Sequence, residues 1–337
     1  MQQPILIKKD GDQMATEQNL QQLSLKPSDH KAGLIARSSA SQQIDALRPF
    51  KCALRRPSAS VVAIVLSTLA FGPLSGSPAK ARSLEAIKQA GQLRVTLYQN
   101  YKPWSWQEDG KLKGIDVDVG AALAKQLGLK VDYLELRAED DIGDDLRNGV
   151  WRGSLLGTQP GDVMLHVPHD KQIEADNDKI KLVAPYHTEG LAMAVEPAQA
   201  ESARDFALFE KEKIAVDGGT LSDIILLSAR DHKLIDRVVH FKGVAKAAMA
   251  YQNGEVSAFY GEAATVENLA HSVSRPVSII YPQYWLAREW TIGGAVKVAD
   301  IELGEAIDKG VAELKSSGEM QRIFAAYGVS WHAPPQD

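Results

Sequence analysis

From about residue 82 onward, the hydrophobic positions follow two periodicities. Short apolar runs and alternations predict strands, whereas apolar residues every three or four positions predict amphipathic helices. The predicted strands are 93–97, 130–136, 162–167, 191–195, 213–216, 238–241 and 256–260. The predicted helices are 83–91, 116–127, 222–229, one that begins at 244, 300–316 and 318–327. This alternation of strands and helices predicts an α/β fold with mainly parallel sheets.

Residue types at the ends of these helices predict their caps. Ser83 is an N-cap candidate, and Gly91 is placed to end the same helix in a left-handed conformation. Asp116 or Asp118 can cap the helix 116–127. The acidic loop 139–145 offers the oxygen ligands that calcium prefers, but it lacks the spacing of a calcium-binding loop. We therefore expect a solvated turn that caps the next helix.

The first 81 residues differ from the rest of the chain. They hold 10 Lys and Arg against 5 Asp and Glu, whereas the remainder holds 28 against 38. Residues 1–50 are polar without apolar periodicity, which predicts disorder. Residues 51–81 combine a basic cluster, the apolar stretch 61–74 and Ala79-Lys80-Ala81. That order is typical of a cleavable secretory signal peptide and predicts export to the periplasm.

Composition excludes several classes of protein. The chain has 337 residues, of which 45% are hydrophobic and 24% charged, as in ordinary globular proteins. Its single cysteine, Cys52, excludes an internal disulfide and a cysteine-based zinc site. The acidic body after residue 81 argues against general affinity for nucleic acid, because cations are not in excess over carboxylates.

Four segments resemble family 3 of the bacterial extracellular solute-binding proteins. They are PWSWQEDGKLKGIDVDVGAALAKQLG (103–128), KIAVDGGT (213–220), NGEVSAFYGE (253–262) and the stretch 293–329. The resemblance implies a two-lobed type II periplasmic-binding-protein fold with two crossover hinge strands and a cleft between the lobes. Lobe 1 would comprise 82–186 plus 288–337, and lobe 2 would comprise 187–287. It also implies hinge closure around a small ligand, delivery to an inner-membrane ABC transporter, no catalysis and no cofactor.

The sequence departs from the amino-acid-binding members of that family at the end of the strand 162–167. Their serine or threonine positions correspond to His166 and His169, and their carboxylate-binding arginine corresponds to Lys171 or Gln172. Lysine replaces a bidentate guanidinium poorly. The resemblance with these departures implies a small polar ligand other than a standard amino acid.

Seven residues are candidate ligand contacts on this resemblance. Tyr101 would stack on the ligand, His166 and His169 would exchange hydrogen bonds with it, and Glu262 would hold a cation or hydroxyl. An acidic group would meet the Gly219 and Thr220 backbone before a helix, where N–H groups attract anions. The last candidate is Trp104, for which packing within a lobe is the alternative.

Three alternative interpretations remain open at this point. His166, His169, Asp170, His187 and Glu189 could supply metal ligands, although their spacing matches no zinc signature. The segment 147–170 is similar to family members that accompany pyrroloquinoline-quinone-dependent alcohol or methanol dehydrogenases, which implies an accessory protein with a shallow or occluded cleft. A dehydratase acting on cyclohexadienyl acids is the third, with His166 or Glu262 as the general acid.

Overall fold

The computed structural model describes residues 82–139, 141–154, 157–284 and 289–335, which lie in one compact unit of the chain, Pro73–Asp337. The predicted disorder of 1–50 and the predicted signal peptide 51–81, with Cys52, lie outside the described residues. No helix within these ranges is long and apolar enough to cross a membrane.

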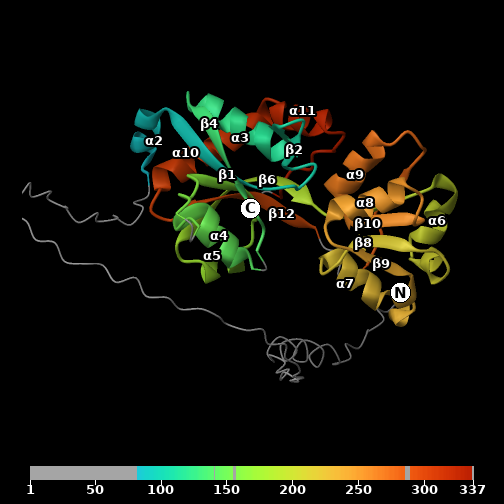
Figure 1. Cartoon of the computed structure of the whole chain (residues 1–337). Helices are drawn as coiled ribbons and strands as arrows, with labels where there is room; N and C mark the ends of the chain where they lie inside the picture. The colour runs from blue at the N-terminus through green and yellow to red at the C-terminus, as the bar shows by residue number, and fades with distance from the viewer. Residues whose placement is uncertain (1–81, 140, 155–156, 285–288, 336–337) are drawn as a thin grey trace, which may run out of the picture. The chain divides into compact units, whose positions relative to one another are not determined.

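Two five-stranded sheets divide the described residues into two lobes (Figure 1). The first sheet has the strand order β4-β1-β5-β12-β6. Strand β1 runs parallel to β4 and β5, whereas β12 runs antiparallel to β5 and β6. Its strands are β1 (Gln92–Tyr98), β4 (Lys130–Leu136), β5 (Val163–Pro168), β6 (Ile180–Glu189) and β12 (Trp290–Lys297).

The second sheet has the order β11-β7-β10-β8-β9. Strands β8, β9 and β10 run parallel, and β7 runs antiparallel to both β10 and β11. Its strands are β7 (Leu191–Val195), β8 (Ile214–Asp217), β9 (Val238–Phe241), β10 (Ala258–Glu262) and β11 (Ser278–Ile280). A separate two-stranded hairpin joins β2 (Trp106–Glu108) to β3 (Lys111–Lys113).

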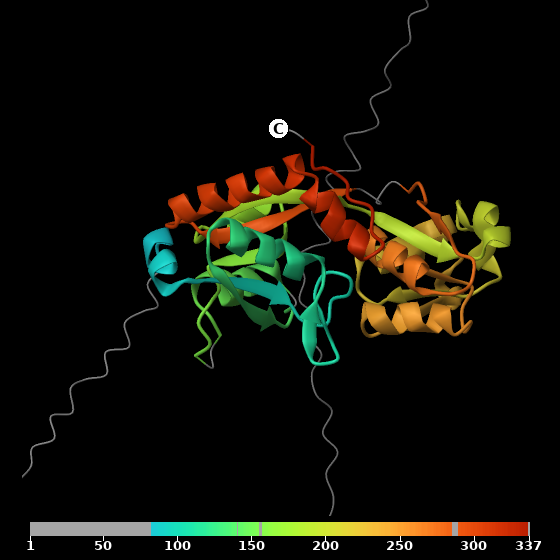
Figure 2. The ribbon, with the colours of Figure 1, turned by 90° about the horizontal axis from the view of Figure 1, so that it is seen from above.

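Helices cover both sheets, and α10 runs alongside β6 and β12 in the first lobe (Figure 2). The first lobe contains α2 (Leu84–Ala90), α3 (Ile115–Gln126), α4 (Ile142–Leu146), the π-helix η1 (Arg147–Trp151), α5 (Lys171–Asp176), α10 (Ile301–Ser316) and α11 (Glu319–Ala326). The second contains η2 (Pro197–Gln199), α6 (Ala200–Ala203), η3 (Ala207–Glu210), α7 (Leu221–Ser228), η4 (Ala229–His232), η5 (Ile235–Arg237), α8 (Val244–Gln252) and α9 (Ala263–Ser272).

Most of the predicted helix ends are confirmed, but one is wrong. Ser83 accepts a hydrogen bond from the Ala86 N–H, and Gly91 ends α2 with a φ of 68°. The N-cap of α3 is Gly114 rather than Asp116 or Asp118. A Cβ atom at Gly114 would lie 2.0 Å from the Trp104 carbonyl oxygen, so close backbone contact requires glycine at this cap.

The acidic loop caps the helix that follows it, as predicted. Asp141 accepts a hydrogen bond of 2.6 Å from the Gly143 N–H at the start of α4. Asp145, in contrast, is buried and accepts hydrogen bonds from Tyr98 Oη at 2.8 Å and from the Glu139 N–H at 2.9 Å. The loop therefore supplies a cap and a buried acceptor for a tyrosine of β1.

The chain passes from the first lobe to the second between β6 and β7, at Gly190, and β12 belongs to the first sheet again. The C-terminal tail lies along this crossing. The Thr188 N–H donates to the His332 carbonyl at 3.0 Å, and Trp331 Nε1 donates to the Tyr186 carbonyl at 2.7 Å. The Ser330 N–H donates to Glu267 of α9 at 2.6 Å. The tail thus contacts the crossing strand and the second lobe together.

Candidate functional site

A cavity of about 1030 Å³ lies between the two lobes. Its lining includes residues at the carboxyl ends of parallel strands in both sheets, which is where open α/β sheets bind ligands. On the first-lobe side these are Tyr98 at the end of β1 and Arg137 just after β4. On the second-lobe side they are Asp217, Lys242 and Glu262, which end or follow β8, β9 and β10. The cavity is therefore lined by aromatic rings and by charges of both signs.

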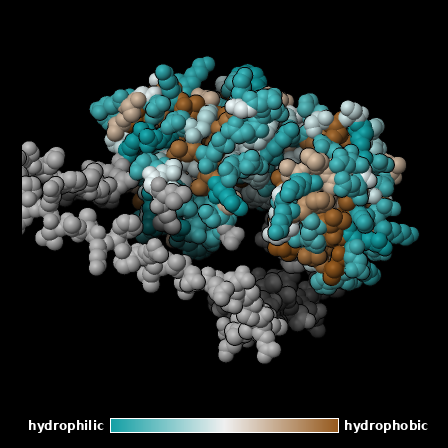
Figure 3. Space-filling view, viewed as in Figure 1, coloured by the Kyte–Doolittle hydropathy of each residue, from teal (hydrophilic) through white to brown (hydrophobic). Residues whose placement is uncertain are grey.

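Apolar side chains are exposed on the second lobe near this cavity. Figure 3 shows hydrophobic residues, in brown, over the part of the lobe where α7, β8 and β9 lie in Figure 1. Leu221 of α7 lines the cavity and is 37% exposed, and Ile224 one turn later is 52% exposed. The second-lobe rim of the cavity thus combines apolar surface with the charged residues at the strand ends.

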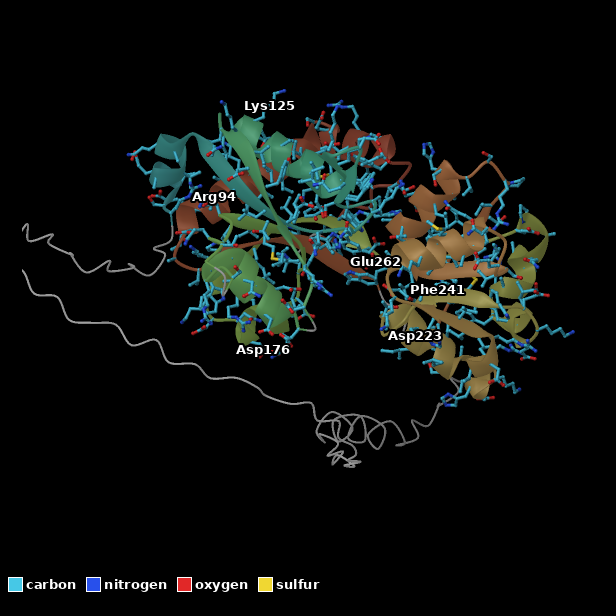
Figure 4. All side chains as sticks on the ribbon, viewed as in Figure 1. Arg94, Lys125, Asp176, Asp223, Phe241 and Glu262 are labelled. Atoms are coloured by element: carbon cyan, nitrogen blue, oxygen red, sulfur yellow. The ribbon has the colours of Figure 1, made fainter. Side chains whose placement is uncertain are left out.

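A hydrogen bond between Tyr101 and Glu262 joins the two lobes. Tyr101 Oη lies 2.7 Å from Glu262 Oε1 and 2.6 Å from Oε2. Figure 4 labels Glu262 at the side of the second lobe that faces the first. Burial and the Glu262 charge raise the pKa of Tyr101 well above its ordinary value, so its hydroxyl stays a donor. Two candidate ligand contacts, one from each lobe, are therefore hydrogen-bonded to each other.

One of the backbone N–H groups expected to bind an anion already has a carboxylate partner, and so does the N–H group before α8. The Gly219 N–H donates to Asp223 Oδ2 at 2.8 Å, and the Gly243 N–H before α8 donates to Asp217 Oδ1 at 2.8 Å. Thr220 caps α7 with its side chain and lines the cavity. The second lobe thus presents carboxylates where the resemblance implied an acidic ligand group.

His166 lies next to the cavity in a buried polar group with Tyr186 and Asp116. Its N–H donates to Tyr186 Oη at 3.1 Å, and the Tyr186 hydroxyl donates to Asp116 Oδ1 at 2.6 Å. Asp116 Oδ2 lies 3.2 Å from His166 Nδ1. His166 has a φ of 61°, an uncommon conformation for a non-glycine residue that surrounding contacts must hold.

Trp104 and His169 occupy different surroundings. Trp104 is fully buried in the first-lobe core, with its ring centroid 4.4 Å from that of His166 and 5.8 Å from that of Phe324. The His169 N–H donates to the Thr291 carbonyl of β12 at 2.8 Å, and its ring is half-buried. Neither Trp104 nor His169 belongs to the cavity lining, which includes Tyr101, Thr220 and Glu262.

The residues considered as metal ligands do not assemble into one site. Among the residues that the structure describes, no group of three or more His, Cys, Asp or Glu side chains is arranged to hold a metal ion. His166 pairs with Asp116, whereas His187 packs against Phe324 with ring centroids 4.7 Å apart. These side chains therefore serve separate contacts within the first lobe and the crossing strand.

Arg137 and Lys242 are cavity residues that our sequence reasoning missed. Both are exposed, and each follows the carboxyl end of a strand, β4 and β9 respectively. Both strands had been predicted from the sequence, so the rule that ligands meet the carboxyl ends of parallel strands could have found these residues.

We expect the stability of the protein to fall as the pH drops below about 6.5, in part because of His187. Burial, followed by the charges of His332 and His166, lowers the pKa of His187 to about 3. Between the unfolded pKa of about 6.5 and this folded pKa, the unfolded state binds more protons than the folded state. The free energy of unfolding should therefore be lower at pH 5 than at pH 7 by roughly 2 kcal/mol. Denaturant unfolding at pH 7 and pH 5 would measure this loss.

His187→Asn is the matched variant for this measurement. Asparagine can replace the Nδ1 atom that accepts the His332 N–H at 3.3 Å, but it does not titrate. The variant should lose less stability between pH 7 and pH 5 than the wild type. Equal losses would show that the acid sensitivity arises elsewhere.

The sequence of the first lobe matches the sequence model of the bacterial extracellular solute-binding proteins, family 3, over residues 93–151. A probable histidine-binding protein from Campylobacter jejuni is 26% identical over 191 residues, which cover 50% of this chain and 67% of that protein. These two matches support the resemblance seen in the sequence segments.

Solved structures with the same fold include two amino-acid-binding proteins. An ancestral cationic amino acid solute-binding protein has a TM-score of 0.59 and 22% identity, over 73% of this chain and 99% of its own. The second is a Streptococcus pneumoniae amino acid ABC transporter substrate-binding protein bound to L-arginine. It has a TM-score of 0.55 and 21% identity, over 73% of this chain and 97% of its own. The described chain therefore has the two-lobed type II periplasmic-binding-protein fold.

Proposed function

We propose that this chain is a family 3 solute-binding protein that captures a small cationic solute in the cavity between its lobes. The observation that carries this proposal is the arrangement at the second-lobe strand ends. Glu262 offers a carboxylate to the cavity beside Tyr101, while Asp223 and Asp217 accept from the Gly219 and Gly243 N–H groups that precede α7 and α8. A cation can pair with the carboxylate and lie against aromatic rings.

The two-lobed fold supports capture by closure of the lobes. The cavity has residues from both lobes in its lining, so closure around a solute would surround the solute with contacts from both sides. The accessory-protein alternative implies a shallow or occluded cleft, and a cavity of about 1030 Å³ favours capture. We further propose that the loaded protein acts in the periplasm and delivers its solute to an ABC transporter. The link to a quinoprotein dehydrogenase and the dehydratase alternative stay predictions.

Calorimetric titration with matched pairs of probes tests the class of solute. Each pair consists of an amino acid and its decarboxylated amine: L-arginine with agmatine, and L-histidine with histamine. We expect the amine to bind at least as tightly as its amino acid, because the Gly219 and Gly243 N–H groups already donate to Asp223 and Asp217. Binding of the amino acids without their amines would instead assign Arg137 or Lys242 as the carboxylate partner and overturn this part of the proposal.

A further inference from the structure

Glu189 is a buried carboxyl group at the point where the chain crosses between the lobes. It is the last residue of β6, directly before Gly190, and only 1% of it is exposed. Its Oε1 atom accepts hydrogen bonds from the Gly190 N–H at 2.8 Å and the Ala264 N–H at 3.4 Å. Its Oε2 atom is buried and has no hydrogen-bond partner within the described part of the chain. An ionised carboxylate with one oxygen buried and without a hydrogen bond would carry a large desolvation cost.

Glu189 shares its surroundings with Glu262. The Ala263 N–H donates to the Gly190 carbonyl at 2.9 Å, which brings the end of β10 to the crossing. Both carboxyls lie at the N-terminus of α9, where Glu262 is the N-cap residue. A helix N-terminus carries roughly half a unit of positive charge and cannot offset two carboxylates. Burial first, and then the Glu262 charge, raise the pKa of Glu189 well above its ordinary value.

Among the residues that the structure describes, the other titratable groups that interact with Glu189 do not supply a compensating positive charge. Besides Glu262, four groups interact electrostatically with Glu189. They are Tyr101 in the first lobe, Tyr186 on the same strand β6, Glu267 on α9 and Tyr281 after β11. All four are acidic or neutral side chains. The two oxygens of Glu267 already accept from Tyr281 Oη at 2.8 Å and the Ser330 N–H at 2.6 Å.

We propose that Glu189 holds a proton on Oε2 in the empty protein and releases it when a cation binds at Glu262, so that capture exchanges a proton for the cationic solute. The proton is placed on Glu189 because both oxygens of Glu262 lie within hydrogen-bond distance of the Tyr101 hydroxyl, whereas Oε2 of Glu189 has no partner among the described residues. On capture, the O–H bond of Glu189 breaks, the proton passes to the buffer, and the positive charge of the solute replaces it. The charge of the site is then unchanged, which is favourable for buried groups.

This proposal rests on the proposed capture of a cation, and calorimetry separates the two. Agmatine and L-arginine serve as probes, because a guanidinium group stays protonated throughout the pH range of the measurement. Titrations between pH 6 and pH 7.5, in two buffers of different ionisation enthalpy, give the number of protons released. We expect up to one proton per bound cation, with affinity falling by up to about tenfold for each unit of decrease in pH.

Glu189→Gln should abolish both the release and the pH dependence, while it keeps the shape of the side chain. Glu267→Gln is the matched control at the same crossing and should still release the proton. Binding without proton release, or release that persists in Glu189→Gln, would overturn the exchange but leave cation capture intact. If agmatine, L-arginine and histamine all fail to bind, both capture and exchange are overturned.

An infrared difference spectrum provides a measurement that needs no ligand. A protonated carboxyl group has a C=O stretching band that a carboxylate lacks. We expect such a band in the empty wild-type protein near neutral pH and its loss in Glu189→Gln. A wild-type spectrum identical to that of Glu189→Gln in this region would overturn the assignment of the proton to Glu189.

Discussion

Replacement of Glu262 by glutamine is expected to weaken the binding of a cationic solute by about 100-fold, or roughly 2.7 kcal/mol. Glutamine keeps the size of the side chain and can still accept a hydrogen bond from Tyr101, so the lobes should remain connected. It removes the negative charge that the cavity presents at the end of β10. Calorimetry with agmatine on the wild type and on Glu262→Gln would measure the difference.

A control for this result is Glu174→Gln. Glu174 lies on α5 and forms an ion pair with Lys181 at 2.7 Å, away from the cavity lining. The Glu174→Gln substitution removes the same net charge without touching the site. The affinity of this variant for agmatine should match that of the wild type. If Glu262→Gln binds agmatine as tightly as Glu174→Gln does, Glu262 does not hold the cation.

Replacement of Trp104 by alanine is expected to destabilise the protein by about 3–5 kcal/mol. Trp104 is fully buried and packs against His166, His187 and Phe324. Its removal would leave a cavity in the core beneath the His166 network. The midpoint of thermal unfolding should fall by roughly 10 °C for a body of this size, which calorimetric or fluorescence melting would measure.

Trp104→Phe separates core packing from ligand contact. The Trp104 Nε1 atom is buried and has no hydrogen-bond partner among the residues placed in the structure, so phenylalanine loses none of the described hydrogen bonds. We expect less than half of the stability loss of the alanine variant and little change in affinity for a bound probe. A phenylalanine variant that keeps its stability but loses affinity would make Trp104 a ligand contact after all.

The pattern of apolar and polar positions along the chain predicted most of the main strands and helices. The predicted ranges 130–136, 191–195 and 238–241 coincide with β4, β7 and β9. β7 is a continuous apolar run, β9 is mostly apolar, and β4 alternates apolar with charged residues, so the local pattern alone defines them. Strands β6, β11 and β12 and helices α5 and α9 have no counterpart among the ranges predicted from apolar periodicity. In β6, Lys181 and Thr188 interrupt the apolar run, and pairing with β12 decides the conformation.

The candidate site was predictable where a residue's position along a strand fixed its direction. Tyr101, Thr220 and Glu262 line the cavity, because each follows or ends a strand whose carboxyl end faces the other lobe. Trp104 lies only three residues after Tyr101, yet it is buried in the core. The turn between them reverses the chain, with the Trp104 N–H donating to the Tyr101 carbonyl at 2.7 Å, and so sends the two rings in different directions.

The sequence by itself determined most of the order of strands and helices and the resemblance to a two-lobed receptor, because both depend on local patterns of residues. Only the tertiary structure decided the electrostatics of the site. It placed Asp223 on the Gly219 N–H, joined Tyr101 to Glu262 across 161 residues, and buried Glu189 beside Glu262. Charges interact according to their separation in space and their exposure to water, and neither can be read from spacing along the chain.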